Sequence, residues 1–324
     1  MRLTVEDILR GTRAGPRQSV GVMEVIPLLG EDDDTFAPPH VEVGTSHYGT
    51  VDLRNDDERP TIVPPGAGWV VKQAAQDHAI GSGKLMRAGQ SVKIDTARCI
   101  QQSQGGYIGR DKHPMVVLPA ALRGRALAMR NETGYDKLWP DITRFNTRLG
   151  ASTGHGGGHL EYFLRHFAKQ LDEFVAEFEL VPDQRGAIIL IGGRVVGVEL
   201  TPNQAFWRHV WEPLVRVCYG SLAIEMAKAL GERASVARPL RVLDDSLEGL
   251  EEALAQATSR ERADVEAVVR RLAGLVLSQG AVEGQLGRWR ARIELTTVAS
   301  PQLAGQVAHR GNEVRYASLC ASGA

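Results

Sequence analysis

The sequence contains few cysteines and no long apolar run. Its 324 residues include only Cys99, Cys218 and Cys320, which form no CxxC pair. Three scattered cysteines do not make a disulfide framework, and this favours a reducing compartment. No run approaches the roughly 18 apolar residues of a membrane-spanning helix, and the N-terminal segment carries acidic residues where a signal peptide has a continuous apolar stretch. We therefore expect a cytoplasmic protein with no membrane anchor and no membrane partner.

The sequence also lacks an excess of charge of either sign. Its 38 Lys and Arg residues are balanced by 39 Asp and Glu residues, for a formal net charge of -1. Such a chain has no overall positive field to attract a polyanion, so a nucleic-acid partner is not expected. The hydrophobic fraction of 43% is ordinary for a globular protein, and the length suits two domains or one large mixed domain.

Two kinds of hydrophobic periodicity divide the chain near residue 118. From about residue 19 to 117, short runs, several of them alternating in polarity, are separated by turn residues, a pattern typical of antiparallel strands. No long helical pattern lies between these runs, which argues against a Rossmann arrangement. From about residue 118 the period becomes that of a helix. We predict an α+β fold, in which an N-terminal antiparallel β-rich layer (1–118), sandwich- or barrel-like, packs with a mainly helical region (119–324).

The helical region also contains strand signals. Two apolar runs around Gly192 and Gly193 predict a β-hairpin over residues 187–200, because adjacent glycines permit the positive φ values of a tight turn. Alternation returns after Trp289, which predicts terminal strands. Because β character returns in this way, the two regions can also form one composite domain.

Two further helical patterns have different characters. Apolar residues at three- and four-residue steps predict one long amphipathic helix over residues 158–180. Residues 246–277 carry interleaved acidic and basic residues, which is typical of exposed helices. We predict a charged helical pair there, whose face serves for packing or for contact with a protein partner.

Three segments carry a resemblance to a known family. They are TSHYGTVDLRN, VVKQAAQDHAI followed by CIQQSQGGYI, and GAIILIGGRVVGVELTPNQAFWRHVWEPLVRV. In order and local pattern, over about residues 19 to 230, the chain resembles an uncharacterised prokaryotic family named for its association with ARG and rhodanese-phosphatase superfamily proteins. The resemblance implies an α+β intracellular protein whose genomic company is that of stress or conflict systems. It transfers no catalytic residue.

The densest polar segment surrounds two short predicted strands. If these strands pair, their side chains face one another, and amide groups beside a Gly-Gly suit recognition of a base, an amide or a sugar. Alternatively, Asp77 orients His78 as a base and Cys99 is the nucleophile of a hydrolase. The same residues also fit a purely structural role, with a buried thiol, a capped turn and a cross-strand ladder. The candidate ligand-binding residues of this segment are Gln76, Gln101, Gln102, Gln104, Gly105 and Gly106, and His47 of TSHYGT either joins them or lies on the surface.

A glycine-rich string with two histidines precedes the long predicted helix. His155 and His159 are four residues apart, a spacing at which two imidazoles on a helix can hold a divalent metal such as zinc. The glycines between them disfavour a helix that far back and indicate instead an anion site at the helix start. A flexible, structural helix start fits as well. The anion-binding candidates are Gly156, Gly157 and Gly158, with Arg144 of a nearby arginine-rich stretch for a phosphate group.

These patterns support one functional prediction and two rivals. We predict a protein that binds a small or nucleotide-like ligand at the Gln-, His- and Gly-rich segments. The first rival is a hydrolase that uses Cys99 and His78, or a metal held by His155 and His159. The second is a protein–protein interaction module without catalysis, acting through residues 246–277. The sequence leaves open whether the protein is an enzyme and whether the polar segments meet in space.

Overall fold

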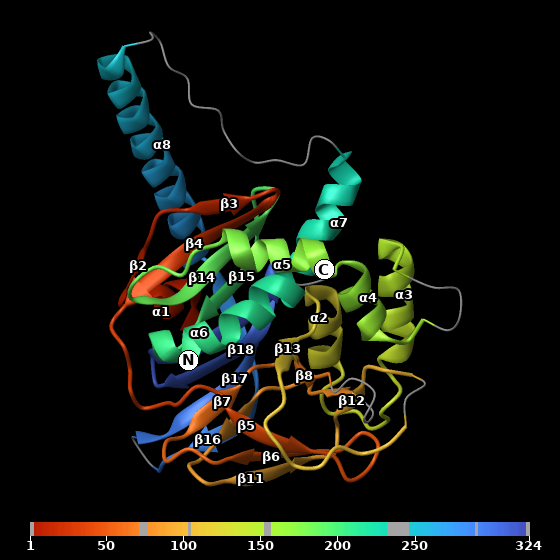
Figure 1. Ribbon diagram of the computed structural model, residues 1–324. Coiled ribbons are helices and arrows are strands. Elements are labelled where there is room, and N and C mark those ends of the chain that lie inside the picture. Colours follow the sequence, from red (N-terminus) through yellow and green to blue (C-terminus); the bar gives the residue numbers. More distant parts are fainter. Residues whose placement is uncertain are drawn as a thin grey trace.

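The protein is an α+β structure, as the sequence predicts. The computed structural model describes residues 3–70, 77–102, 105–151, 157–231, 246–288 and 291–321. A large antiparallel sheet is covered by helices and adjoins several smaller sheets (Figure 1). Within these ranges, no helix is both long enough and apolar enough to cross a bilayer.

A ten-stranded antiparallel sheet forms the centre of the described structure. N-terminal strands lie at both of its ends and strands from beyond residue 118 lie between them, so the two regions predicted from the sequence share one sheet. In spatial order the strands are β1 (Leu3–Thr4), β16 (Val276–Leu286), β17 (Ile293–Ala299), β18 (Leu303–Arg310), β19 (Glu313–Ala321), β15 (Arg194–Leu200), β14 (Gln184–Ile191), β4 (Met23–Gly30) and β2 (Thr12–Ala14), and β3 (Gln18–Val20) pairs with β4.

The hairpin predicted near residues 187–200 is formed by β14 and β15. Its turn residues, Gly192 and Gly193, have φ angles of 56° and 76°. This is the left-handed region, in which glycine is favoured over residues that carry a Cβ atom. The hairpin prediction is confirmed.

The N-terminal region outside the large sheet consists of short strands in three small sheets. Every pairing among them is antiparallel, which agrees with the predicted β-rich layer. The strands are β5 (Val41–Gly44), β6 (Val51–Asn55), β7 (Thr61–Val63), β8 (Ala67–Trp69), β9 (His78–Ala79), β10 (Lys84–Met86), β11 (Ser91–Ile94), β12 (Arg98–Cys99) and β13 (Met115–Val117).

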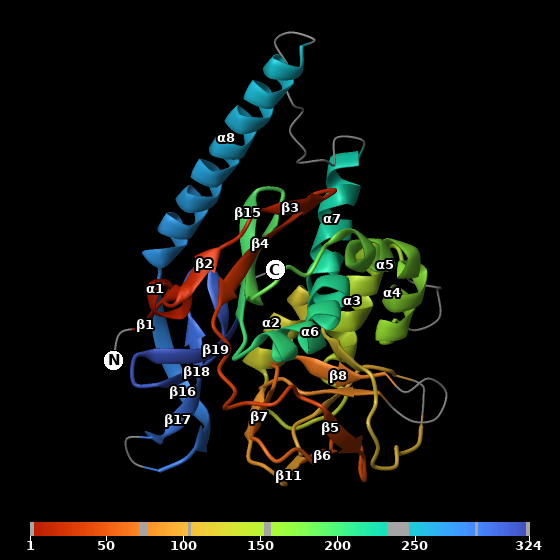
Figure 2. The same ribbon diagram turned by 60° about the vertical axis from the view of Figure 1, so that its left-hand side comes forward.

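Helices cover both faces of the large sheet, and α8 projects beyond the body (Figure 2). They are α1 (Val5–Leu9), α2 (Ala120–Ala128), α3 (Trp139–Leu149), α4 (Leu160–His166), α5 (Ala168–Glu177), α6 (Gln204–Glu212), the π-helix η1 (Pro213–Tyr219), α7 (Gly220–Leu230) and α8 (Leu247–Ala273).

Two helix predictions differ from the structure. The single helix predicted over residues 158–180 is two helices, α4 and α5, which meet at Phe167. The ring of Phe167 is 4% exposed, so the change of direction keeps the apolar stripe buried. The helical pair predicted over residues 246–277 is one uninterrupted helix, α8, with N-cap Ser246 and C-cap Gly274.

Both faces of strand β14 are buried, which explains its unbroken apolar run. Ala187, Ile189 and Ile191 belong to a core shared with α6, η1 and α7. Ile188 and Leu190 belong to a second core, shared with α1 and α8. A strand that is covered on both faces has no solvent-facing positions, so it does not alternate between apolar and polar residues.

A buried ion pair joins α2 to the large sheet. Arg123 of α2 and Glu199 of β15 are each 2% exposed, and Arg123 Nη1 donates to Glu199 Oε1 over 2.9 Å. Ser318 Oγ of β19 accepts from Arg123 and donates to Glu199, while the Tyr219 hydroxyl donates to Glu199 Oε1 over 2.6 Å. Burial by itself lowers the pKa of Arg123, but the charge of Glu199 raises that pKa well above its usual value. Helix α2, strand β19 and helix η1 are therefore all fixed to one carboxylate.

We predict that Arg123→Met lowers the free energy of unfolding by about 3 to 5 kcal/mol, because it leaves a buried carboxylate uncompensated. Urea denaturation measures the change. The matched control is Arg310→Met, which removes an ion pair with Glu313 whose side chains are 44% and 49% exposed, at an expected cost of about 0 to 1 kcal/mol. Equal losses in the two variants would contradict the role of the buried pair.

A second stability prediction concerns His209 of α6, whose ring lies 4.0 Å from that of His40 between centroids. Burial, reinforced by His40, lowers the pKa of His209 from 6.5 to about 4. Between these pH values the unfolded state binds more protons than the folded state, so the free energy of unfolding falls as the pH drops. We expect this group to account for a loss of about 2 kcal/mol at pH 4.5. Urea denaturation at pH 7 and 4.5 should give a smaller difference for His209→Gln than for the wild type; an unchanged difference would refute the assignment.

Candidate functional site

The two polar strands of the sequence prediction lie side by side in the structure. β9 and β12 pair antiparallel, with Cys99 opposite His78. Asp77, His78 and Cys99 are 3%, 2% and 0% exposed. The candidate acid–base and nucleophilic side chains are thus neighbours, but they lie in the interior rather than in an open cleft.

His78 supports the loop that carries His47. Its Nε2 accepts a hydrogen bond from the backbone N–H of Gly49 over 3.2 Å. An imidazole nitrogen that accepts in this way is unprotonated, so the neutral ring carries its proton on Nδ1. This bond fixes the loop between β5 and β6, on which the side chains of His47 and Tyr48 are exposed.

Cys99 makes structural contacts in the same place. Its Sγ donates to the backbone carbonyl of Gln101 over 2.9 Å. Burial raises the pKa of the Cys99 thiol to about 11. Because the thiolate is the nucleophile, a thiol held in this state does not support the hydrolase alternative.

The glycine-rich helix start converges with the glutamine segment. Gln101 and His159 form an isolated antiparallel bridge. The backbone N–H of Gly158 donates to Gln102 Oε1 over 3.3 Å, and Asn146 Nδ2 of α3 donates to the carbonyls of Gly157 and His159 over 2.9 and 2.8 Å. The segments whose proximity the sequence left open therefore meet against α3.

The two described glycines of this string are required by close packing. A Cβ atom on Gly157 would lie 2.7 Å from Thr143 Cγ2, and one on Gly158 would lie 2.6 Å from Gln102 Oε1 and 3.0 Å from Trp139 Cβ. Larger residues at these two positions would push α3 and the end of β12 away from the glycine-rich string. The anion-site hypothesis gains no support here, because α4 has only seven residues and the Gly158 N–H is already used.

Two buried polar atoms at this junction have no hydrogen-bond partner within the described part of the chain. They are Gln101 Oε1 and Asn146 Oδ1; the nearby Trp139 side chain instead hydrogen-bonds to the Cys99 thiol. The Asn146 amide cannot be reversed without loss, since its Nδ2 serves two carbonyls. Leaving such an atom unsatisfied costs about 1 to 3 kcal/mol, so the junction has two acceptors that a further hydrogen-bond donor would stabilise.

A row of four aromatic rings leads from this junction to the surface. Trp139 lies 5.6 Å from Tyr135, Tyr135 lies 5.5 Å from Tyr48, and Tyr48 lies 5.3 Å from Tyr107, between ring centroids. Tyr48 and Tyr107 are 43% and 51% exposed. Sequence reasoning did not identify Tyr107, Tyr135 or Trp139, although the Gly-Gly-Tyr of the quoted glutamine segment was a signal for the first.

The remaining candidates are placed as follows. Gly105 and Gly106 are exposed beside this row, and a Cβ on Gly105 would lie 3.4 Å from the Tyr48 hydroxyl. Arg144 lies on the exposed side of α3 and pairs with Asp141. His159 is 7% exposed, and burial lowers its pKa. Gln76, Gln104, His155 and Gly156 lie outside the described residues.

The metal hypothesis rests on His155 and is not tested by the geometry. Among the described residues, no group of three His, Cys, Asp or Glu side chains could hold a metal ion. His159, the described member of the predicted pair, stacks on Tyr162 with ring centroids 4.8 Å apart.

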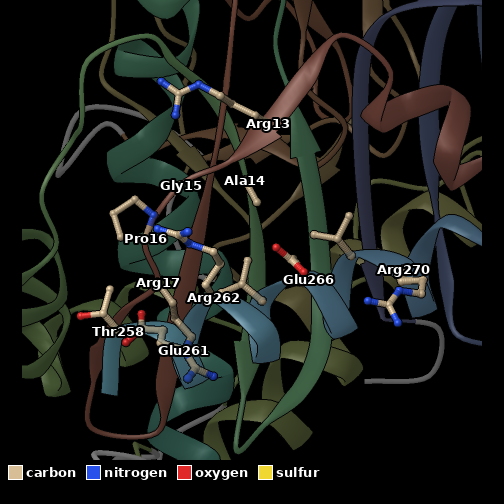
Figure 3. Close-up of a pocket in the computed structure, with 12 residues that line it drawn as sticks. Arg13, Ala14, Gly15, Pro16, Arg17, Thr258, Glu261, Arg262, Glu266 and Arg270 are labelled. Atoms are coloured by element: carbon tan, nitrogen blue, oxygen red, sulfur yellow. The ribbon is translucent and has the colours of Figure 1, made fainter. Parts of the chain in front are cut away.

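A separate groove lies on the far side of the sheet, between α8 and the segment that follows β2 (Figure 3). Its volume is about 950 Å³, and arginines line both of its walls. Arg13 and Arg17 come from the N-terminal segment, while Arg262 and Arg270 come from α8. Sequence reasoning did not identify this groove, because it depends on where α8 docks.

A comparison with protein families supplies one match. A family model described as ARG and Rhodanese-Phosphatase-superfamily-associated Protein domain matches residues 11–291. No curated protein and no solved structure matches the chain. The matched range contains the polar junction, the aromatic row and α8.

The burial of Cys99 generates a test. We expect Cys99 to react with a soluble thiol probe at pH 7 no faster than Cys218 or Cys320, which are also buried, because little thiolate forms and no path reaches it. Mass spectrometry of timed labelling reactions measures the three rates. Selective labelling of Cys99 would restore the nucleophile hypothesis.

Proposed function

The chain belongs to the family of ARG- and rhodanese-phosphatase-superfamily-associated proteins, and on this premise we propose that it binds a small, nucleotide-like ligand where the aromatic row meets the polar junction. The row consists of Tyr48, Tyr107, Tyr135 and Trp139, and the junction consists of Gln101, Asn146 and the Gly157–His159 backbone. The family is uncharacterised, so the proposal rests on the geometry of this site.

The observation that carries the proposal is the pairing of unsatisfied amide oxygens with exposed aromatic rings. Gln101 is 7% exposed and Asn146 is 0% exposed, yet each has an amide oxygen without a partner among the residues that the structure describes. The Trp139 side chain contacts this junction at Gly158 and is also the inner ring of the row. A planar ligand with N–H donors on its edge satisfies the oxygens and stacks on the rings.

A nucleobase has this combination of a flat π-face and edge donors. Base–aromatic stacking contributes about 1 to 3 kcal/mol per base, and exposed tyrosines supply it at small entropic cost. Arg144, on the exposed side of α3, is the proposed contact for a phosphate, and His47, exposed beside Tyr48, is the proposed contact for a sugar hydroxyl.

Binding without catalysis is the form of the proposal that the geometry favours. The protonated, buried state of Cys99 argues against covalent chemistry, and a metal-dependent hydrolase would depend on His155. A cytoplasmic location and a role in a stress or conflict system remain predictions from the sequence.

Calorimetric titration of the full chain with the four nucleosides and their 5′-monophosphates tests this proposal. We expect at least one to bind, and we expect Tyr107→Ala to weaken its affinity by about 5- to 100-fold through loss of stacking. The control is Val282→Ala, which truncates an exposed apolar side chain (46%) on β16, a strand of the large sheet that contributes no ring to the row. Absence of binding at millimolar concentration, or equal affinity of Tyr107→Ala and wild type, would exclude the site.

A second pair of variants tests the phosphate contact. Arg144→Ala is expected to weaken binding of the monophosphate about fivefold and to leave binding of the nucleoside unchanged, since a surface charge contact to phosphate contributes about 1 kcal/mol. Arg148→Ala, one turn along the same helix and paired with Glu225, is the matched control. Equal effects of Arg144→Ala on nucleoside and nucleotide would remove Arg144 from the site.

A further inference from the structure

Helix α8 docks on the body through only one of its halves. It has 27 residues, which corresponds to a length of about 40 Å at about 1.5 Å per residue. Val265, Val268 and Leu272 are buried in the core beneath the sheet, whereas the N-terminal half of the helix stands clear of the body (Figures 1 and 2).

The free half of α8 carries an exposed apolar stripe. Leu247, Leu250 and Leu254 are 73%, 38% and 50% exposed. With about 3.6 residues per turn, Leu247, Leu254 and Val265 fall within about 20° of one another around the helix axis. The exposed leucines therefore lie on the same face of α8 as Val265 and Val269, which line the groove.

The charges of the free half and of the groove are complementary. Glu248, Glu251 and Glu252 are the charged residues of α8 before Arg260. Of the arginines that line the groove, Arg17 is already paired with Glu24 over 2.8 Å and with Asp264 over 3.9 Å, which leaves Arg13, Arg262 and Arg270 beside Glu261 and Glu266. One end of the helix is thus apolar and acidic, and the groove at its other end combines apolar residues with three further arginines.

We propose that two copies of this chain pair through antiparallel α8 helices, so that the free half of each helix occupies the arginine-lined groove of the other copy. The free half of α8 (residues 247–258) and the half that lines the groove (258–270) are nearly equal in length. When the two α8 helices lie antiparallel and cross at Thr258, the leucine stripe of each copy therefore lies in the groove of the other. Such a contact is isologous and closes as a two-fold dimer. It is independent of the proposed ligand site.

The antiparallel arrangement shows why the helix of a second copy fits the arginine-lined groove. In this arrangement Leu247 of one copy lies opposite Val269 of the other, and Glu248 and Glu251 approach the arginines of the groove. The contact buries the exposed leucines and also brings the glutamates of the free half close to Arg13, Arg262 and Arg270 of the groove.

Sedimentation equilibrium of the full chain at micromolar concentration tests the dimer. We expect a dimer for the wild type and at least a hundredfold weaker association for Leu247→Glu/Leu254→Glu. Because these leucines are exposed, we expect the variant to have the same thermal unfolding curve and circular dichroism spectrum as the wild type. The control is Gln256→Glu/Ala263→Glu, which adds the same charge on the opposite, exposed face of α8. A wild-type monomer at 100 μM, about a hundredfold above a dissociation constant of 1 μM, or a leucine variant that dimerises like the wild type, would overturn the proposal.

Reciprocal charge reversal tests the pairing between helix and groove. Glu248→Arg/Glu251→Arg and Arg13→Glu/Arg270→Glu are each expected to associate at least tenfold more weakly than the wild type. Mixed together, the two variants are expected to form a heterodimer, because both contacts are then complementary again. Failure of the mixture to associate, while the wild type dimerises, would place the interface elsewhere.

Discussion

The arrangement of the described structure depends on one buried carboxylate. Glu199 lies in the middle of the large sheet and is bound by Arg123, Ser318 and Tyr219. A buried charge costs several kcal/mol unless it is paired, so α2 must dock where Arg123 reaches it. A second buried arginine, Arg98 of β12, then donates to the carbonyls of Met129, Glu132 and Gly134, just beyond the end of α2. Arg123 thus holds α2 on the large sheet, and Arg98 holds β12 at the end of α2. The glutamine segment that follows β12 is positioned by the same contacts.

The same packing gives structural roles to residues that the sequence suggests as catalytic or ligand-binding. Next to Arg98, Cys99 is a buried thiol with a raised pKa, and His78 holds a loop through Gly49. Gly157 and Gly158 are small because α3 touches them. The groups left for the proposed recognition are two amide oxygens without partners in the described part of the chain and a row of rings that reaches solvent. The supporting residues and the proposed recognition residues are thus adjacent, and the first group fixes the second.

Local signals predicted much of the fold and part of the site. The period-2 runs and the Gly192–Gly193 turn are properties of neighbouring residues and led to correct elements, whereas the 3.6-residue patterns located helical segments but not the number of helices in them. The break at Phe167 was not predictable in this way, because the stripe of apolar residues continues through it. For the site, the segments around Gln101 and Gly158 were identified, whereas Trp139 and Tyr135 were missed since their role comes from packing on residues distant in sequence.

By itself, the sequence determined the α+β class, the antiparallel pairing of the N-terminal strands, the family, and which segments are polar and rich in glycine. These follow from short-range periodicity and backbone freedom. Only the tertiary structure decided that the polar segments meet at α3, that Cys99 is enclosed, and that the N-terminal half of α8 leaves its leucines exposed next to an arginine-lined groove. Burial, pKa and exposure depend on which elements cover a residue, and that covering is set by long-range packing around the Arg123–Glu199 pair.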